Sequence, residues 1–118
     1  MRLIHFTDLA GVDYVNITRR SLKKFGLRAC IRYEALIKQA TYDLAIDPHR
    51  AGSRPKHNLQ TGLYFYHLKH SRRSASRPVD RVQEPRHFIV YRIPNITQIQ
   101  IVRVLHDRMQ FSRQEYPS

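Results

Sequence analysis

The spacing of apolar residues in this 118-residue chain changes at Asp47-Pro48, and that change constrains the fold more than any other feature. Before it, apolar side chains recur every three or four residues, as along one face of an amphipathic helix. After it, they come in short runs separated by proline, glycine and basic residues, which is the pattern of short strands. The sequence therefore predicts an α+β fold with its helices first and most of its strands last.

Two helices are predicted, over residues 8–25 and 27–46. Asp8 is a favourable N-cap for the first helix, and Gly26 is a natural stop between the two. Pro48 ends the second helix, because proline disfavours helical backbone in the residue before it. The tight connection predicts an antiparallel helix hairpin.

Four segments have the length and composition of strands: 2–7, 63–70, 86–93 and 97–106. We expect the last three to form an antiparallel meander, with a turn at Pro94-Asn95 and the helix hairpin packed across one face. The first strand can pair only at a sheet edge or beside the last strand. The remaining segments are predicted to be a loop, a long basic connection and a C-terminal tail of one domain, 1–118: residues 48–62, 71–85 and 107–118.

Side chains alternate between the two faces of a strand, so the last strand can be divided into two sets. Ile99, Ile101, Arg103 and Leu105 are predicted to share one face, and Gln100, Val102, Val104 and His106 the other. One sheet face must meet the helices. We expect the other to be partly open to water and to carry a basic patch with aromatic residues between, formed by some of Arg92, Arg103, His67 and Lys69.

The chain is strongly basic, with 21 lysine and arginine residues against 9 acidic ones and a formal net charge of +12. Such a field favours a polyanionic partner, either nucleic acid or an acidic protein. The single cysteine, Cys30, cannot form an internal disulfide and is expected to be a core or half-buried thiol. No apolar run is long enough to span a bilayer, and the N-terminus lacks the apolar region of a secretory signal. We therefore expect a cytoplasmic protein without membrane contact.

The stretch IVRVLHDRM, residues 101–109, places an imidazole, a carboxylate and two guanidinium groups at the end of the last strand. A catalytic site, a docking surface and a salt-bridged strand end would each produce such a cluster. In phosphodiester chemistry a guanidinium stabilises charge on phosphate, and an imidazole or phenol moves the proton. The candidates for those roles are Arg92, Arg103, His106, Arg108 and Tyr116.

Each of these residues also has an ordinary structural explanation. Arg103 could form an ion pair with a helix carboxylate such as Glu34 or Asp43. His106 and Asp107 could form a hydrogen bond at the strand end that holds the tail. The segment HLKH, 67–70, is not expected to bind a metal, because positions three apart on a strand point to opposite faces. No cofactor is expected.

The order of strand, helix hairpin and meander resembles the RelE/ParE superfamily of bacterial type II toxin–antitoxin toxins. DPHRAGSR (47–54) resembles the loop after the second helix in these proteins. LYFYHLKHSRR (63–73) and PRHFIVYRI (85–93) are similar to the paired central strands of a ParE-like branch. IQIVRVLHDRMQF (99–111) is similar to the last strand and its ending in that branch.

The resemblance implies a toxin that arrests growth and is neutralised by a cognate antitoxin. ParE-like members inhibit DNA gyrase through protein contacts, whereas RelE-like members are ribosome-dependent mRNA endonucleases. The RelE-like ending usually sets a tyrosine shortly after the last strand, where this chain has Phe111, with Tyr116 later in the tail. The first interpretation is therefore a gyrase inhibitor; the residues that would contact the target are Arg92, Arg103, His106, Arg108 and Arg113.

Two other interpretations stay open. One is the mRNA endonuclease, in which Arg92, Arg103, His106, Arg108 and Tyr116 would carry the chemistry. The other is an inactive or general nucleic-acid-binding relative. The antitoxin site is not assigned to particular residues, although sheet edges and the groove of the helix hairpin are the surfaces that strand addition or helix docking would use.

Overall fold

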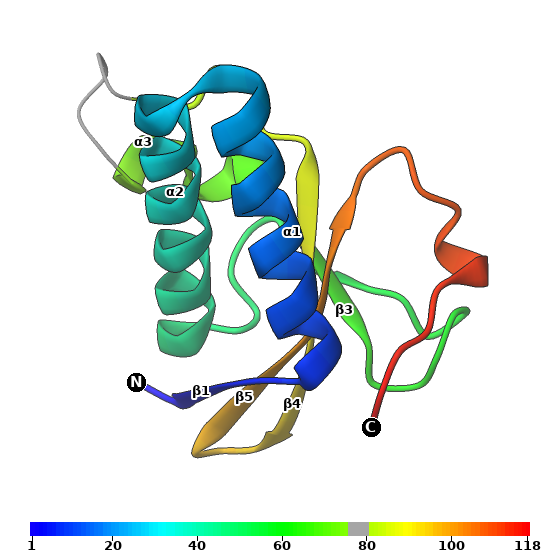
Figure 1. Cartoon of the computed structure of the whole chain (residues 1–118). Coiled ribbons are helices and arrows are strands. Elements are labelled where there is room, and N and C mark those ends of the chain that lie inside the picture. Colours follow the sequence, from blue (N-terminus) through cyan, green and yellow to red (C-terminus); the bar gives the residue numbers. More distant parts are fainter. Residues whose placement is uncertain (76–80) are drawn as a thin grey trace.

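The computed structural model describes residues 1–75 and 81–118, which form a helix layer packed on a mixed β-sheet (Figure 1). The helices α1 (Asp8–Phe25) and α2 (Leu27–Ile46) run antiparallel on one face of the sheet. The sheet has five strands in the order β1-β5-β4-β3-β2. The strands are β1 (Leu3–Phe6), β2 (Arg54–Pro55), β3 (Tyr64–His67), β4 (His87–Asn95) and β5 (Gln98–His106).

The predicted α+β fold and its strand pairing are confirmed. Strands β3, β4 and β5 form the antiparallel meander, and β1 lies parallel to β5 at the sheet edge. The additional strand β2 was not predicted. It has two residues inside the predicted loop 48–62, where Arg54 pairs with Phe65 and Pro55 with Tyr64.

The predicted helix boundaries are confirmed, but the N-cap of α1 is Thr7 rather than Asp8. The Thr7 side-chain oxygen accepts a hydrogen bond from the Ala10 amide at 3.1 Å, and its hydroxyl donates to the Val102 carbonyl at 2.7 Å. Asp8 is instead the first helical residue, where its negative charge is favourable beside the helix N-terminus. Gly26 separates the two helices with a φ of 90°, a conformation that glycine adopts at little cost.

The predicted strand 63–70 ends at His67. A 3₁₀ turn, Leu68–Ser71, follows, because the His67 Nδ1 accepts the Lys69 amide at 3.1 Å and turns the backbone. The predicted connection 71–85 then begins with α3 (Arg72–Ala75), and its residues 76–80 lie outside the described part of the chain.

The turn between β4 and β5 lies at Ile96-Thr97, two residues later than predicted. The Asn95 side chain causes the shift: its Oδ1 accepts the Thr97 amide at 2.9 Å and the Thr97 hydroxyl at 2.8 Å. Asparagine commonly forms such side-chain turns with the backbone two residues on.

The main core lies between the helix hairpin and the sheet. Its buried side chains come from α1, α2 and every long strand, and the largest are Tyr66, Tyr91, Leu36, Ile37, Leu44, Leu68, Ile89, Ile99 and Ile101. Cys30 is buried at the helix interface, as predicted, and burial raises the pKa of its thiol.

The second sheet face is not open to water, so that prediction was wrong. Five side chains form a second buried cluster there: Leu63, Phe65, Val90, Val102 and Leu105. The loop before β3 and the C-terminal tail fold across them and contribute Leu59, Phe111 and Tyr116. Figure 1 shows the tail on the side of the sheet away from the helices.

A β-bulge at Val102 reverses the predicted division of side chains at the end of β5. Ile101 pairs with Tyr91 while Arg103 pairs with Val90, so Val102 is an extra residue. Beyond it, Val104 packs in the main core and Leu105 in the second cluster, opposite to the prediction. An insertion of one residue exchanges the faces of all the following side chains, because strand side chains alternate with period two.

Candidate functional site

The buried ion pair of Arg103 with Asp13 closes the open edge of β5. Strand β1 pairs with β5 only as far as Ile101, so the following residues face α1 instead. Asp13 Oδ2 accepts the Val104 amide at 3.0 Å and the Arg103 Nε at 2.8 Å, while Oδ1 accepts Arg103 Nη2 at 3.0 Å. The two side chains are only 11% and 13% exposed. Hydrogen bonding to Asp13 raises the pKa of the Arg103 guanidinium.

The partner of Arg103 therefore differs from the predicted one. The sequence pointed to a carboxylate of the second helix, Glu34 or Asp43, whereas the structure supplies Asp13 from α1. Asp43 instead pairs with Arg50 at 2.7 Å, and Glu34 accepts a hydrogen bond from the Cys30 thiol at 3.3 Å.

Two of the candidate arginines hold the C-terminal tail. Arg103 Nη1 donates to the Glu115 carbonyl at 3.0 Å, and Arg92 Nη1 donates to the Pro117 carbonyl at 2.5 Å. Between these contacts the Tyr116 hydroxyl donates to the Phe111 carbonyl at 2.6 Å. Burial raises the pKa of Tyr116 and lowers that of Arg92. Arg92, Arg103 and Tyr116 are thus brought together, but by bonds to main-chain oxygens of the tail.

His106 lies on the other side of β5, in a cluster of rings with His87 and Tyr33. The His87 and His106 rings meet edge to face, with centroids 5.1 Å apart. The Tyr33 oxygen is 2.6 Å from His87 Nδ1, within hydrogen-bond distance, and accepts the Arg86 amide at 3.0 Å. Burial, reinforced by His106, lowers the pKa of His87 to about 4, and burial raises that of Tyr33 to about 12. Both groups are neutral at pH 7.

Asp107 ties together the ends of three strands. Its Oδ2 accepts from His67 Nε2 at 3.2 Å, its Oδ1 lies 3.1 Å from Arg86 Nη2, and its amide donates to the Arg86 carbonyl at 2.8 Å. Burial raises the pKa of Asp107, but hydrogen bonding from His67 and the charge of Arg86 outweigh it and keep that pKa below its usual value.

The predicted bond between His106 and Asp107 takes a different form. His106 Nδ1 accepts the Arg108 amide at 3.1 Å, and lies 3.6 Å from the Asp107 carboxylate. The carboxylate contacts β3 and β4 rather than the tail.

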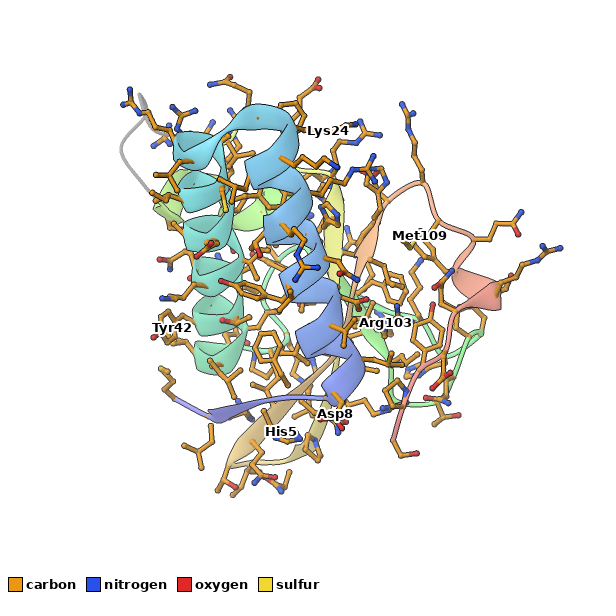
Figure 2. The ribbon with its side chains drawn as sticks, in the orientation of Figure 1. His5, Asp8, Lys24, Tyr42, Arg103 and Met109 are labelled. Atoms are coloured by element: carbon orange, nitrogen blue, oxygen red, sulfur yellow. The ribbon has the colours of Figure 1, made fainter. Side chains whose placement is uncertain are left out.

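A groove of about 950 Å³ opens beside this ring cluster, between α1, α2, the segment 81–86 and the end of β5. We call it the basic groove, because six cationic side chains line it: Arg20, Lys24, Arg32, Arg81, Arg86 and Arg108. Its apolar lining comes from Ile17, Phe25, Ala29, Val82, Val104 and Met109. Figure 2 labels two residues of its rim, Lys24 near the end of α1 and Met109 on the C-terminal loop.

The candidate residues from the sequence are therefore divided between two places. Arg92, Arg103 and Tyr116 lie at the tail, with Arg113 exposed on the short 3₁₀ helix Phe111–Arg113. His106 and Arg108 lie in the basic groove.

Sequence reasoning missed most of the groove. Arg20 and Lys24 could have been found, because residues four apart lie on the same side of a helix. Nothing in the sequence places Arg81 and Arg86 opposite them, since that depends on the path of the connection before β4.

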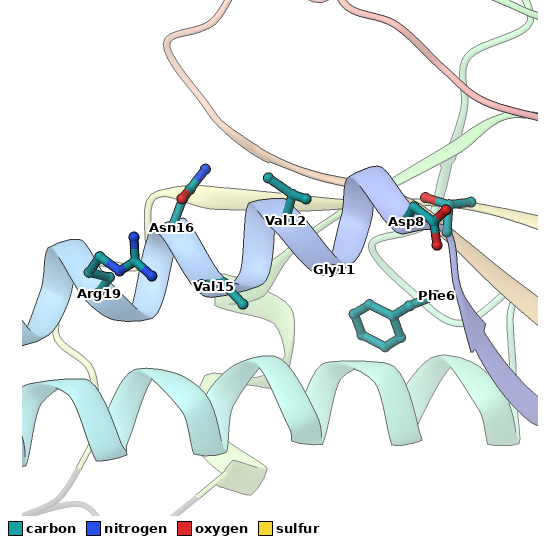
Figure 3. Close-up of a pocket in the computed structure, with 8 residues that line it drawn as sticks. Phe6, Asp8, Gly11, Val12, Val15, Asn16 and Arg19 are labelled. Carbon is teal, nitrogen blue, oxygen red and sulfur yellow. The ribbon is translucent and has the colours of Figure 1, made fainter.

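A second, shallow groove lies on the outer side of α1 and is lined by that helix and the end of β1 (Figure 3). Val12, Val15 and Arg19 lie along it, with Phe6 of β1 near one end. Val12 and Val15 are about half exposed, at 53% and 47%. These valines belong to the apolar pattern of the helix, but they do not enter the core, so α1 leaves part of its apolar surface uncovered.

The described residues contain neither a candidate metal site nor a membrane-spanning helix. Over residues 1–75 and 81–118, no group of three or more histidine, cysteine, aspartate or glutamate side chains could hold a metal ion. His67 and His70 have separate environments, His67 beside Asp107 and His70 beside the Tyr66 ring. Within those same ranges, no helix is long and apolar enough to cross a membrane.

Comparison with known families agrees with the fold. The family described as ParE toxin of type II toxin-antitoxin system, parDE, matches residues 4–111. The match covers both long helices, the meander and the strand ending LHDRM. No curated protein matches the chain. The family match spans most of the chain, and the protein accordingly belongs to the ParE toxin family of type II toxin–antitoxin systems.

Proposed function

We propose that this protein arrests growth by inhibiting DNA gyrase in the cytoplasm and that a cognate antitoxin neutralises it. The observation that carries the proposal is the ParE family match over residues 4–111. The net charge of +12 is compatible with an acidic partner segment.

The contacts of the candidate residues favour binding over hydrolysis. A shared phosphodiester site would need Arg92, Arg103 and Tyr116 within reach of His106 and Arg108. Instead, the first three are bonded to Asp13 or to tail carbonyls, and His106 lies on the opposite side of the sheet. These contacts support a target-binding role for the rest of the set: the exposed Arg108 and Arg113 and the half-buried His106.

The antitoxin is proposed to dock on the shallow groove of α1 and on the adjacent outer edge of β1. Strand β1 is the last strand of the sheet and pairs on one side only, so it can accept a further strand. Val12 and Val15 offer apolar contacts beside that edge, and Arg19 offers a positive charge.

A supercoiling assay tests the proposed target. Purified protein is added to gyrase, ATP and relaxed plasmid, with and without excess antitoxin. We expect loss of supercoiling or accumulation of cleaved DNA, reversed by the antitoxin. Unaffected gyrase at micromolar protein, together with mRNA cleavage in a translating ribosome extract, would refute gyrase inhibition and favour the endonuclease.

A pair of variants tests the contact residues. Arg108→Gln with Arg113→Gln removes two exposed charges from the proposed surface, and we expect weaker inhibition. Arg54→Gln with Lys69→Gln removes two exposed charges elsewhere and serves as the matched control. Equal loss in both variants would show that net charge, and not this surface, determines inhibition.

A further inference from the structure

The basic groove concentrates positive charge that the rest of the fold does not use. Its six cationic side chains face only two carboxylates in the lining, those of Asp13 and Glu84, and Asp13 is already bonded to Arg103. Among the described residues, Arg20, Lys24, Arg32 and Arg108 form no ion pair, and of the six only Arg86 does. Cations held together without counter-charge repel one another, so the groove has the electrostatics of a site for an anionic ligand.

One wall of the groove is rich in rings. Tyr33, His87 and His106 form its wall beside β4 and β5, and burial keeps His87 neutral at pH 7 because its pKa is about 4. Phe25 stands at the rim and is 72% exposed, an unusual position for a large aromatic side chain. Neutral flat surfaces enclosed by cations suit a ligand that combines flat rings with phosphates.

The cations are arranged along the groove and not around one point. Arg20 and Lys24 follow each other on α1 with an axial rise of about 6 Å, and Arg81, Arg86 and Arg108 come from segments across the groove. The volume of about 950 Å³ is at the upper end for sites that enclose a small molecule. A chain with repeated charges would use this arrangement better than a single anionic group.

We infer that the basic groove binds a short segment of single-stranded nucleic acid. Arg20, Lys24, Arg32 and Arg108 hold successive phosphates, and Phe25 with the imidazole wall provides surfaces for the bases. Stacking on aromatic side chains tolerates any base, so binding is expected to depend on strandedness and not on sequence. This inference does not rest on gyrase inhibition, because it is argued from the charges and rings of the groove alone, although His106 and Arg108 belong both to the groove and to the proposed target-binding set.

Fluorescence anisotropy with a labelled oligothymidylate of about 12 nucleotides tests the inference, since single-strand sites of this kind cover about 4–16 nucleotides. Four phosphate contacts predict a slope of about −3 for log K against log salt. In the variant Arg20→Gln with Lys24→Gln, two contacts are lost, and the slope should flatten by about 1.4. The corresponding rise in Kd is on the order of 50-fold at about 50 mM salt.

The matched control is Lys23→Gln with Arg28→Gln. These two residues lie on the same helix hairpin, are exposed like Arg20 and Lys24, and lose the same charge, but they line neither groove. We expect their Kd to change by no more than about threefold, which is the effect of net charge alone. Circular dichroism shows whether both variants keep the helix content of the unchanged protein.

A third variant, Phe25→Leu, removes the ring and keeps an apolar side chain. Loss of one stacking surface should raise Kd by about tenfold and leave the salt slope unchanged, because no phosphate contact is lost.

Three outcomes would overturn the inference. The control variant could lose as much affinity as the groove variant, in which case binding follows overall charge. A duplex of equal length could bind as tightly as the single strand. A polyglutamate peptide of equal charge could bind as tightly as the oligonucleotide and weaken in the same variant, which would assign the groove to an acidic peptide. Because no gyrase is present, the result is independent of the supercoiling assay.

Discussion

Removing the Asp13 carboxylate should destabilise the protein more than removing any other acidic group of α1. The carboxylate accepts three N–H groups, two from Arg103 and one from the Val104 backbone. In Asp13→Ala the guanidinium keeps only its bond to the Glu115 carbonyl, and the Val104 amide has lost its acceptor. Leaving a buried charge without its partner costs about 3–5 kcal/mol, and an unsatisfied backbone amide about 1–3 kcal/mol.

We take a value below the sum of these two costs, because a little over one-tenth of each side chain reaches solvent and water can partly replace the lost carboxylate. The expected loss in the free energy of unfolding is about 3 kcal/mol, a large part of the 5–15 kcal/mol typical of a domain. In a chain of this size it corresponds to a fall in Tm of roughly 10 °C. Urea unfolding followed by tyrosine fluorescence measures it, since the chain has seven tyrosines and no tryptophan.

Asp8→Ala is the matched control, because Asp8 is an exposed carboxylate in the first turn of the same helix. It should cost about 0.5 kcal/mol through the helix dipole. A double-mutant cycle with Arg103→Met isolates the pair, and we expect a coupling energy of about 2 kcal/mol. Equal losses for Asp8→Ala and Asp13→Ala, or additive losses in the cycle, would refute the proposed contribution of the ion pair.

Three further perturbations have expected outcomes. The pKa of His87 is about 4 in the folded state against 6.5 ordinarily, so on acidification the unfolded state binds the proton first. The free energy of unfolding should therefore fall by about 3 kcal/mol as pH drops from 6.5 to 4. Urea unfolding of His87→Gln over that range should show a flatter dependence of stability on pH. Gly52→Ala, which adds a strained φ of 101° and a Cβ 2.6 Å from the His70 ring, should lower Tm more than Gly62→Ala, whose φ of 84° meets open space. Phe111→Ala should cost about 2 kcal/mol in chemical denaturation, because its ring packs on Phe65 and Phe88, whereas the half-exposed Met109→Ala should cost under about 0.5 kcal/mol.

The helix hairpin and the meander could be predicted because local signals determine them. Gly26 and Pro48 mark helix ends through backbone chemistry alone, and the structure places both ends where the sequence predicted them. The position of β1 could be predicted because a first strand can pair only at a sheet edge or beside the last strand, and it pairs with β5 at the edge. Thr7 and Asp8 are both good N-caps, and only the contact of Thr7 with Val102 in a distant strand distinguishes them.

The covered second face could not be predicted, because its covering residues lie in segments without periodicity. Leu59, Phe111 and Tyr116 come from a loop and a tail, where isolated apolar residues carry no signal of what they contact. Their packing depends on the path of the chain after β2 and β5, which is a tertiary property.

The bulge at Val102 determines how the cluster at the end of β5 can be used. With strict alternation, Arg103 would lie opposite His106, and Leu105 would face the helices. The extra residue instead turns Leu105 into the second cluster and sets His106 against His87 in the basic groove. Arg103 remains at the bulge, where it can reach both Asp13 and the tail carbonyl of Glu115. One inserted residue thus places His106 beside Arg108 in the basic groove, where both are accessible to a ligand, while Arg103 stabilises the fold. Since the pattern of apolar residues is compatible with either register, the functions of adjacent charged residues in such a strand can be assigned only after the bulge has been located.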